Sequence, residues 1–92
     1  MTRFMIGDIV SHFKHWMTDT TNDEYMYIYR ITGIGFDATH DTEVIMYEPM
    51  YPCEYSVFTR TVEDFEGLVD RSKYPTSPQN YKFELINLNI EK

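Results

Sequence analysis

Short stretches in which apolar and polar residues alternate with a period of two recur along the chain, and this period is typical of β-strands. The strongest, residues 25–36 (YMYIYRITGIGF), is rich in aromatic and β-branched residues and contains no proline. Four weaker stretches predict further strands over residues 8–14, 42–50, 55–60 and 81–86. In the last of these we expect Tyr81, Phe83 and Leu85 to face inward, and Lys82 and Glu84 outward.

Polar, turn-forming residues separate these stretches and predict a loop over residues 18–24 and a hairpin connection over residues 37–41. Gly33 and Gly35 permit a bulge or a sharp bend where a sheet turns a corner. Residues 61–69 are expected to form a short helix, because Thr61 suits the N-cap and apolar residues follow at helical spacing. We expect residues 87–92 to continue the last strand only weakly.

Five strands and one helical turn within 92 residues predict an all-β fold. The expected architecture is a small SH3-like, strongly bent antiparallel barrel, formed as a single domain over residues 1–92. No apolar run reaches the roughly 20 residues that span a bilayer, and no signal peptide is visible. The single cysteine fits a reducing compartment, so a cytoplasmic protein is expected.

The chain is acidic, with 15 Asp and Glu residues against 8 Lys and Arg residues and a net charge of −7. Eight of the acids lie between positions 37 and 66, where Arg60 is the only Lys or Arg residue. Direct binding of nucleic acid is not expected, because its affinity comes mostly from Lys and Arg side chains that neutralise phosphates. The acidic excess favours solubility, or alternatively a mimic of nucleic acid displayed to a basic host protein.

Candidate catalytic and metal-binding residues are few. His12 and His15 are three positions apart, which puts them on opposite faces of a strand, so no metal site is expected. Cys53 is next to Glu54, whose carboxylate would raise the pKa of the thiol and make it a poor nucleophile. We therefore expect no cofactor and no enzymatic activity. An enzyme stays open only because one sequence does not place Cys53 and the three histidines in space.

Arginine and aromatic residues form the candidate binding surface. Arg30 and Arg60 are the only Lys or Arg residues between positions 15 and 70, and we expect them to approach each other in the barrel. An arginine among tyrosines can stack on a base or bind a phosphate or carboxylate with two hydrogen bonds. The alternative is that each arginine pairs with a glutamate across strands and that the tyrosines belong to the core. The candidate ligand-binding residues are Arg30, Arg60, Tyr29, Tyr47, Tyr51 and Phe58.

Several short motifs resemble the bacterial and phage family called domain of unknown function 1653. They are residues 7–10 (GDIV), residues 29–34 (YRITGI) and residues 42–48 (TEVIMYE), and the similarity covers residues 7–84. The chain departs from the family at Asp37, where histidine is common, and at Thr61, where proline is common. The resemblance implies a small β-rich fold but no agreed activity.

The hypothesis that follows is a non-catalytic binding module that holds a small anionic or nucleotide-like ligand on the Arg/Tyr surface. Some members of the family are phage products, and for a phage product the resemblance implies interference with host defence by sequestering a signalling nucleotide. The alternative is an acidic protein-interaction module or nucleic-acid mimic that binds a basic host protein. An exposed sheet edge or the aromatic surplus would also support a homo-oligomer.

Overall fold

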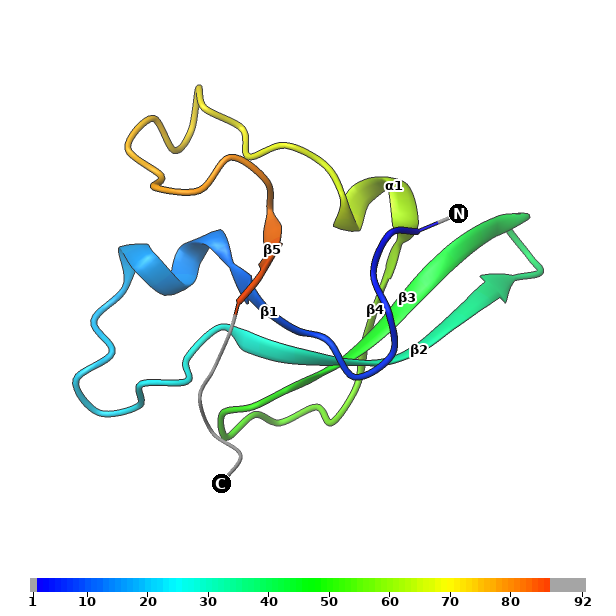
Figure 1. Cartoon of the computed structure of the whole chain (residues 1–92), viewed down its shortest axis with the longest axis horizontal. Helices are drawn as coiled ribbons and strands as arrows, with labels where there is room; N and C mark the ends of the chain where they lie inside the picture. The colour runs from blue at the N-terminus through cyan, green and yellow to red at the C-terminus, as the bar shows by residue number, and fades with distance from the viewer. Residues whose placement is uncertain (1, 87–92) are drawn as a thin grey trace.

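The computed structural model describes residues 2–86 and shows one antiparallel sheet with the strand order β4-β3-β2-β1-β5. A single short α-helix, α1 (Val62–Phe65), lies over this sheet (Figure 1). The prediction of an all-β fold with five antiparallel strands and one short helix is confirmed. Among residues 2–86, no helix has the length and apolar character that a membrane crossing requires. The strands are β1 (Ile9–His12), β2 (Ile28–Asp37), β3 (Thr42–Pro49), β4 (Phe58–Thr61) and β5 (Phe83–Leu85).

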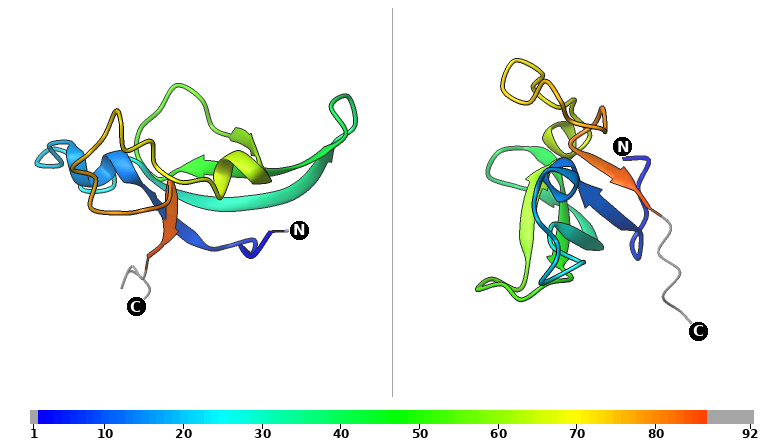
Figure 2. Two further views of the ribbon diagram at one scale, coloured as in Figure 1. Left: turned by 90° about the horizontal axis from the view of Figure 1, so that it is seen from above. Right: turned by 90° about the vertical axis from the view of Figure 1, so that its left-hand side faces the viewer.

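The hairpin of β2 and β3 is the longest part of the sheet and is strongly curved (Figure 2). Its register shifts by one residue between Ile31 and Gly33, so Thr32 is the extra residue of a β-bulge. The side chain of Met46, the partner of Gly33 in β3, lies over this glycine: a Cβ atom at position 33 would be 2.5 Å from Cε of Met46. The bend that the sequence predicts at the glycines is therefore confirmed at Gly33.

Aromatic rings fill the core between the sheet and α1. The rings of Phe65 and Phe83 are stacked with their centroids 4.1 Å apart, and Phe4 meets Phe65 edge-on at 5.2 Å. Ile31 and Ile45 complete this core from the centre of the sheet and are fully buried. Thr61 caps α1, because its Oγ1 accepts a hydrogen bond of 3.0 Å from the backbone N–H of Asp64.

The ends of several elements differ from the sequence prediction. β2 begins at Ile28, because residues 24–27 form a turn in which Tyr27 adopts a φ of 65°. β1 ends at His12 and is followed by a 3-10 helix, η1 (Phe13–Met17). The helix predicted over residues 61–69 ends at Phe65. The expected continuation over residues 87–92 lies outside the described residues.

The last strand is shorter than expected, and its inward face is only partly as predicted. Phe83 is fully buried, but Tyr81 and Leu85 are 39% and 62% exposed, so the prediction that they face inward is wrong. Lys82, expected to face outward, is half-buried and forms an ion pair with Asp64. Tyr81 lies outside the strand, which spans only residues 83–85, and Leu85 is the last residue of that strand and is exposed at its end.

A long loop of residues 66–82 runs from α1 to β5 and passes beside η1 (Figure 1). Gln79 fastens this loop to β1 and η1. Its side-chain oxygen accepts hydrogen bonds of 2.9 Å from both Ser11 Oγ and Trp16 Nε1, and its amide donates to the backbone oxygen of Ser11. These bonds fix the loop against η1, and the rings of Phe13 and Tyr74 meet edge-on at 4.8 Å.

Candidate anion-binding site

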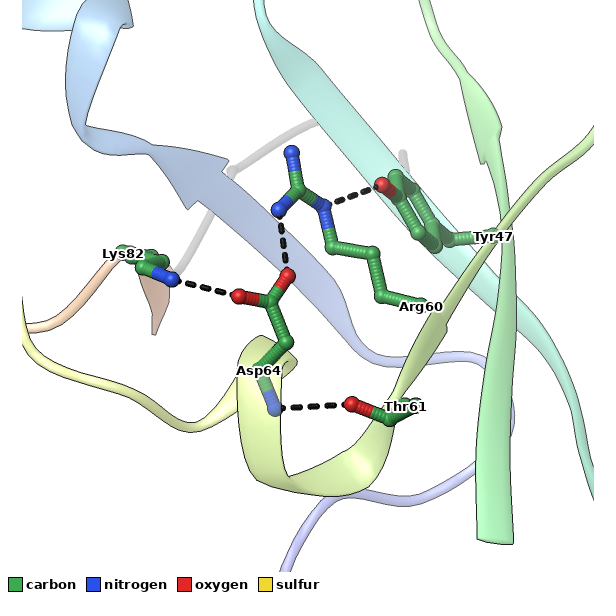
Figure 3. Close-up of polar contacts among 5 residues, drawn as sticks. All are labelled: Tyr47, Arg60, Thr61, Asp64 and Lys82. Atoms are coloured by element: carbon green, nitrogen blue, oxygen red, sulfur yellow. Dashed lines mark hydrogen bonds and ion pairs between the residues drawn. The ribbon is translucent and has the colours of Figure 1, made fainter. Parts of the chain in front are cut away.

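Arg60 and Lys82 meet at the carboxylate of Asp64, between β4, α1 and the start of β5 (Figure 3). Arg60 Nη1 lies 2.6 Å from one oxygen of Asp64, and Lys82 Nζ lies 2.5 Å from the other. Arg60 also donates a hydrogen bond of 2.8 Å from Nε to the hydroxyl of Tyr47. Two cations are thus held side by side on the inner face of the sheet.

The bridge has a consistent effect on the ionisation of its members. The hydrogen bond from Lys82, followed by that from Arg60, holds the pKa of the Asp64 carboxyl below its usual range. Burial would lower the pKa of Arg60, but the hydrogen bonds with Asp64 and Tyr47 outweigh it and raise that pKa. Asp64 and Arg60 are therefore both charged at neutral pH, and the single carboxylate of the bridge faces two basic side chains.

A cavity of about 230 Å³ opens beside this bridge, where η1 and the long loop meet the sheet. Four of the chain's eight Lys and Arg residues line it, against one carboxylate, Asp70. Two aromatic rings and one histidine complete the wall. The full lining is His12, Phe13, Lys14, Arg60, Asp70, Lys73, Tyr74 and Lys82.

Three of the cationic groups retain hydrogen-bonding capacity. Within residues 2–86, neither Lys14 nor Lys73 forms an ion pair, and their Nζ atoms lie 5.7 and 6.0 Å from the centre of the Tyr74 ring. The third nitrogen of Arg60, Nη2, points away from both Asp64 and Tyr47 (Figure 3). The cavity therefore presents N–H donors that form no ion pair within residues 2–86, although the charge of Lys73 acts on Asp70 and, after the hydrogen bonds from Ser72, lowers the pKa of that carboxyl.

His12 reports the electrostatic character of the cavity. Burial, followed by the nearby charges of Arg60, Lys14 and Lys82, lowers the pKa of this histidine to about 4. The ring is therefore neutral at pH 7. Its Nδ1 accepts a hydrogen bond of 3.2 Å from the backbone N–H of Lys14, so the ring proton is on Nε2. A neutral N–H donor thus joins the cations in the wall.

The two arginines of the sequence-based site lie on opposite faces of the sheet. Arg30 is exposed between the buried Tyr29 and Ile31, and it forms an ion pair with Glu48, its partner in the register of β2 and β3. Arg60 faces the core, with its guanidinium 5.2 Å from the centre of the Phe83 ring. The expectation that Arg30 and Arg60 approach each other is corrected: a period of two directs them to different sides.

The four aromatic residues of the sequence-based site form one cluster, in which Tyr29 and Tyr47 belong to the core and Tyr51 and Phe58 pack against it. Tyr29 and Tyr47 are 6% and 4% exposed and meet edge-on at 5.1 Å. Tyr51 packs on them and shares a hydrogen bond of 2.7 Å with the hydroxyl of Tyr29, and Phe58 packs beside Tyr47. Other rings occupy their faces, so of this set only Arg60 lines the cavity.

The sequence did not single out Lys14, Lys73, Tyr74 and Lys82 as site residues. They come from η1, from the long loop and from the residue before β5. No spacing along the chain joins these positions, because the loop is placed by the buried contacts of Gln79. The one signal was indirect: every Lys and Arg residue of this acidic chain except Arg30 and Arg60 lies outside residues 15–70.

Other candidate groups lie apart from the cavity. His15 does not act with His12, because its Nδ1 lies 2.6 Å from the backbone oxygen of Met26. Cys53 is exposed in the connection between β3 and β4. In the described part of the chain, no three His, Cys, Asp or Glu residues are grouped closely enough to hold a metal ion.

Ion pairs neutralise part of the acidic stretch of residues 37–66. Glu48 pairs with Arg30, Asp64 with Arg60 and Lys82, and Glu66 with Arg3. Asp37 lies 2.9 Å from His40 at the tip of the hairpin. Asp37 and Glu48 lie at opposite ends of the β2–β3 hairpin, so these two acids are far apart in the sheet.

No protein-family model matches this chain, and searches of the curated proteins and of the solved structures find no match. The resemblance to the domain of unknown function 1653 therefore stays a prediction. The evidence for a function is the geometry of the cavity itself.

Proposed function

We propose that this protein is a non-catalytic binding module that holds a small anion in the cavity beside the Arg60–Asp64–Lys82 bridge. The observation that carries the proposal is the concentration of charge: in a chain of net charge −7, four cationic side chains line one cavity of about 230 Å³. Such a cavity focuses positive potential locally, whatever the net charge of the whole chain.

The donor set suits an oxyanion such as a phosphate or a carboxylate. Arg60 offers a planar guanidinium held by Tyr47 and Asp64, which limits its freedom before any ligand arrives. Lys14 and Lys73 add two ammonium groups to the same lining. Charge-assisted hydrogen bonds from such groups are the strong ones in proteins, and a pre-positioned arginine loses little entropy on binding.

A binding role without catalysis accounts for the chemistry of the wall. The neutral His12 and the four cations supply donors, and Asp70, the one carboxylate of the lining, accepts two hydrogen bonds from Ser72. The cysteine lies outside this lining. Sequestration of a signalling nucleotide, which the family resemblance implies for a phage product, is one use of such a module and stays a prediction.

The test is isothermal titration calorimetry with pyrophosphate and, separately, citrate as probes. Wild-type protein is expected to bind at least one of them, with an affinity that decreases as salt increases. Lys73→Gln removes a cation that has no ion pair in the described chain, so folding is preserved and binding weakens about fivefold, or ~1 kcal/mol.

Arg30→Gln is the matched control, because it removes the same charge from the opposite face of the sheet. Its affinity for the probe should equal that of wild type. The proposal is wrong if neither probe binds, or if Arg30→Gln weakens binding as much as Lys73→Gln does.

A further inference from the structure

A second cavity lies beside the first, and the two have two lining residues in common. It has a volume of about 330 Å³ and is lined by Lys14, Met17, Thr18, Tyr27 and Tyr74. Lys14 and Tyr74 also line the basic cavity, so these two side chains stand at the junction of the two spaces. The neighbouring cavities differ in chemistry: one is rich in cations, and the other has two tyrosine rings, a thioether and a single cation.

Tyr27 is held in an unusual backbone conformation at the edge of this second cavity. Its φ of 65° lies in the left-handed region. Residues with a Cβ atom rarely adopt this conformation, and bulky aromatic residues adopt it even less often. The turn before β2 supplies this conformation, and the ring packs near His12 and Tyr51, with centroid distances of 5.9 and 6.0 Å. Strain of this kind is concentrated at binding sites in proteins.

We propose that the ligand is a nucleoside phosphate, with its phosphates in the basic cavity and its base against Tyr27 and Tyr74 in the second cavity. This inference rests on the proposed anion site and extends it to a two-part site. The phosphate end meets Lys73, Arg60 and Lys82, and Lys14 at the junction lies within reach of both parts.

The size and lining of the cavities favour a two-part ligand over a small anion alone. Sites for small organic ligands usually have volumes of roughly 300–1,000 Å³, and the basic cavity of about 230 Å³ reaches that range only together with its neighbour. Base–aromatic stacking depends little on which base is present, because every base has a π-face. The second cavity holds no carboxylate, so it also accepts an electron-rich ring without repulsion from its walls.

The first experiment compares ADP with pyrophosphate by isothermal titration calorimetry on the full chain. Both probes carry two linked phosphates, but only ADP carries a base. ADP is expected to bind about tenfold more tightly, because stacking on a tyrosine contributes on that scale. Equal affinities would overturn the inference and leave the anion site standing, whereas no binding of either probe would remove both.

A variant then tests the second cavity directly. Tyr27→Asn removes the ring, and asparagine tolerates the left-handed conformation, so the turn is expected to be preserved. ADP binding should weaken about tenfold and pyrophosphate binding should stay unchanged. The matched control is Tyr55→Asn, since Tyr55 is 61% exposed and lines neither cavity. Unchanged ADP affinity in Tyr27→Asn refutes the inference.

A measurement on wild-type protein covers the case in which Tyr27→Asn does not fold. Met17 is 41% exposed in the second cavity, and its methyl resonance can be assigned by comparison with Met17→Leu. A base placed between the tyrosines should shift this resonance by its ring current. We expect a shift with ADP and none with pyrophosphate. No shift at saturating ADP overturns the placement of the base.

Discussion

Replacing Asp64 by asparagine should make the protein less stable and at the same time a better anion binder. Asp64 is the only carboxylate in the described chain that pairs with Arg60 and Lys82, at 2.6 and 2.5 Å. An asparagine side chain has nearly the same shape as aspartate but no charge, so at neutral pH both cations lose their neutralising partner. The two effects have opposite signs, which separates them from simple unfolding, since unfolding would weaken binding.

The loss of stability follows from the two ion pairs. The side chains of Asp64, Arg60 and Lys82 are 41%, 34% and 28% exposed, so solvent screens each pair, and ~0.5–1 kcal/mol per pair is appropriate. We expect Asp64→Asn to lower the free energy of unfolding by about 1–2 kcal/mol and Tm by roughly 5–15 °C for a domain of this size.

The pH dependence gives the sign of the electrostatic contribution. Lys82 and Arg60 lower the pKa of Asp64 in the folded protein, so its stabilising effect is complete above the unfolded value of 3.8 and is lost as pH falls through the folded pKa. Wild type should therefore be more stable than Asp64→Asn at pH 7, and the difference should begin to shrink below pH 3.8 and disappear as pH falls through the lower folded pKa. Urea denaturation at a series of pH values measures this difference.

The gain in affinity follows from removing a negative charge beside the anion. We expect pyrophosphate to bind Asp64→Asn about fivefold more tightly, which corresponds to ~1 kcal/mol of reduced repulsion in a partly screened site. Asp41→Asn is the control, because it removes the same charge at the tip of the hairpin. Its φ of 56° suits asparagine, so its fold should be undisturbed. If folded Asp64→Asn binds pyrophosphate more weakly than wild type, the cations act through their positioning by Asp64, and the reasoning from charge is refuted.

Two further predictions concern His12 and Gly33. Because the pKa of His12 falls from 6.5 to about 4 on folding, unfolded protein binds more protons between these values, and stability should decrease by up to ~3 kcal/mol as pH is lowered from 6.5 to 4. His12→Asn should remove most of that decrease in urea denaturation, and an unchanged slope would show that His12 is charged in the folded protein. Gly33→Ala should cost less than ~1 kcal/mol, because the conflicting atom is the terminal Cε of the flexible Met46, whereas Gly33→Val should cost more. A thermal melt of both variants decides this, and an equal, large loss in both would mean that the backbone of the bulge tolerates no Cβ atom.

Much of the fold could be predicted from the sequence, because several local patterns determine the backbone conformation of their own segment without help from distant contacts. Three such signals each specify a conformation within a few residues. They are the alternation over residues 28–37, the glycine at position 33 under the Met46 side chain, and the N-cap at Thr61. The limits of the elements were less certain, since tertiary contacts decide them. Residues 25–27 have the composition of a strand, but a turn takes them out of the ladder.

The site was harder to predict because it depends on a loop that carries little periodic pattern. Arg60 was found as a rare cation in an apolar strand, and it does line the cavity. Arg30 was selected on the same grounds, but it is one residue away from the register that would turn it inward. The sequence did not predict that Lys73 and Tyr74 line the cavity, because the hydrogen bonds of Gln79 with Ser11 and Trp16 determine where their loop lies.

Net charge is a poor guide to what such a chain binds, and this structure shows the physical reason. Ion pairs with Glu48, Glu66 and Asp64 engage four of the cations, two of them within the bridge. Lys14 and Lys73 have no such partner within residues 2–86, and both face the same cavity. An anion that approaches this cavity meets a field set by groups a few ångströms away, because salt screens the distant acids over about 8–10 Å. Under the proposed function, the net negative charge of the chain would disfavour long polyanions such as nucleic acid, whereas a small anion would meet mainly the local field of the cavity.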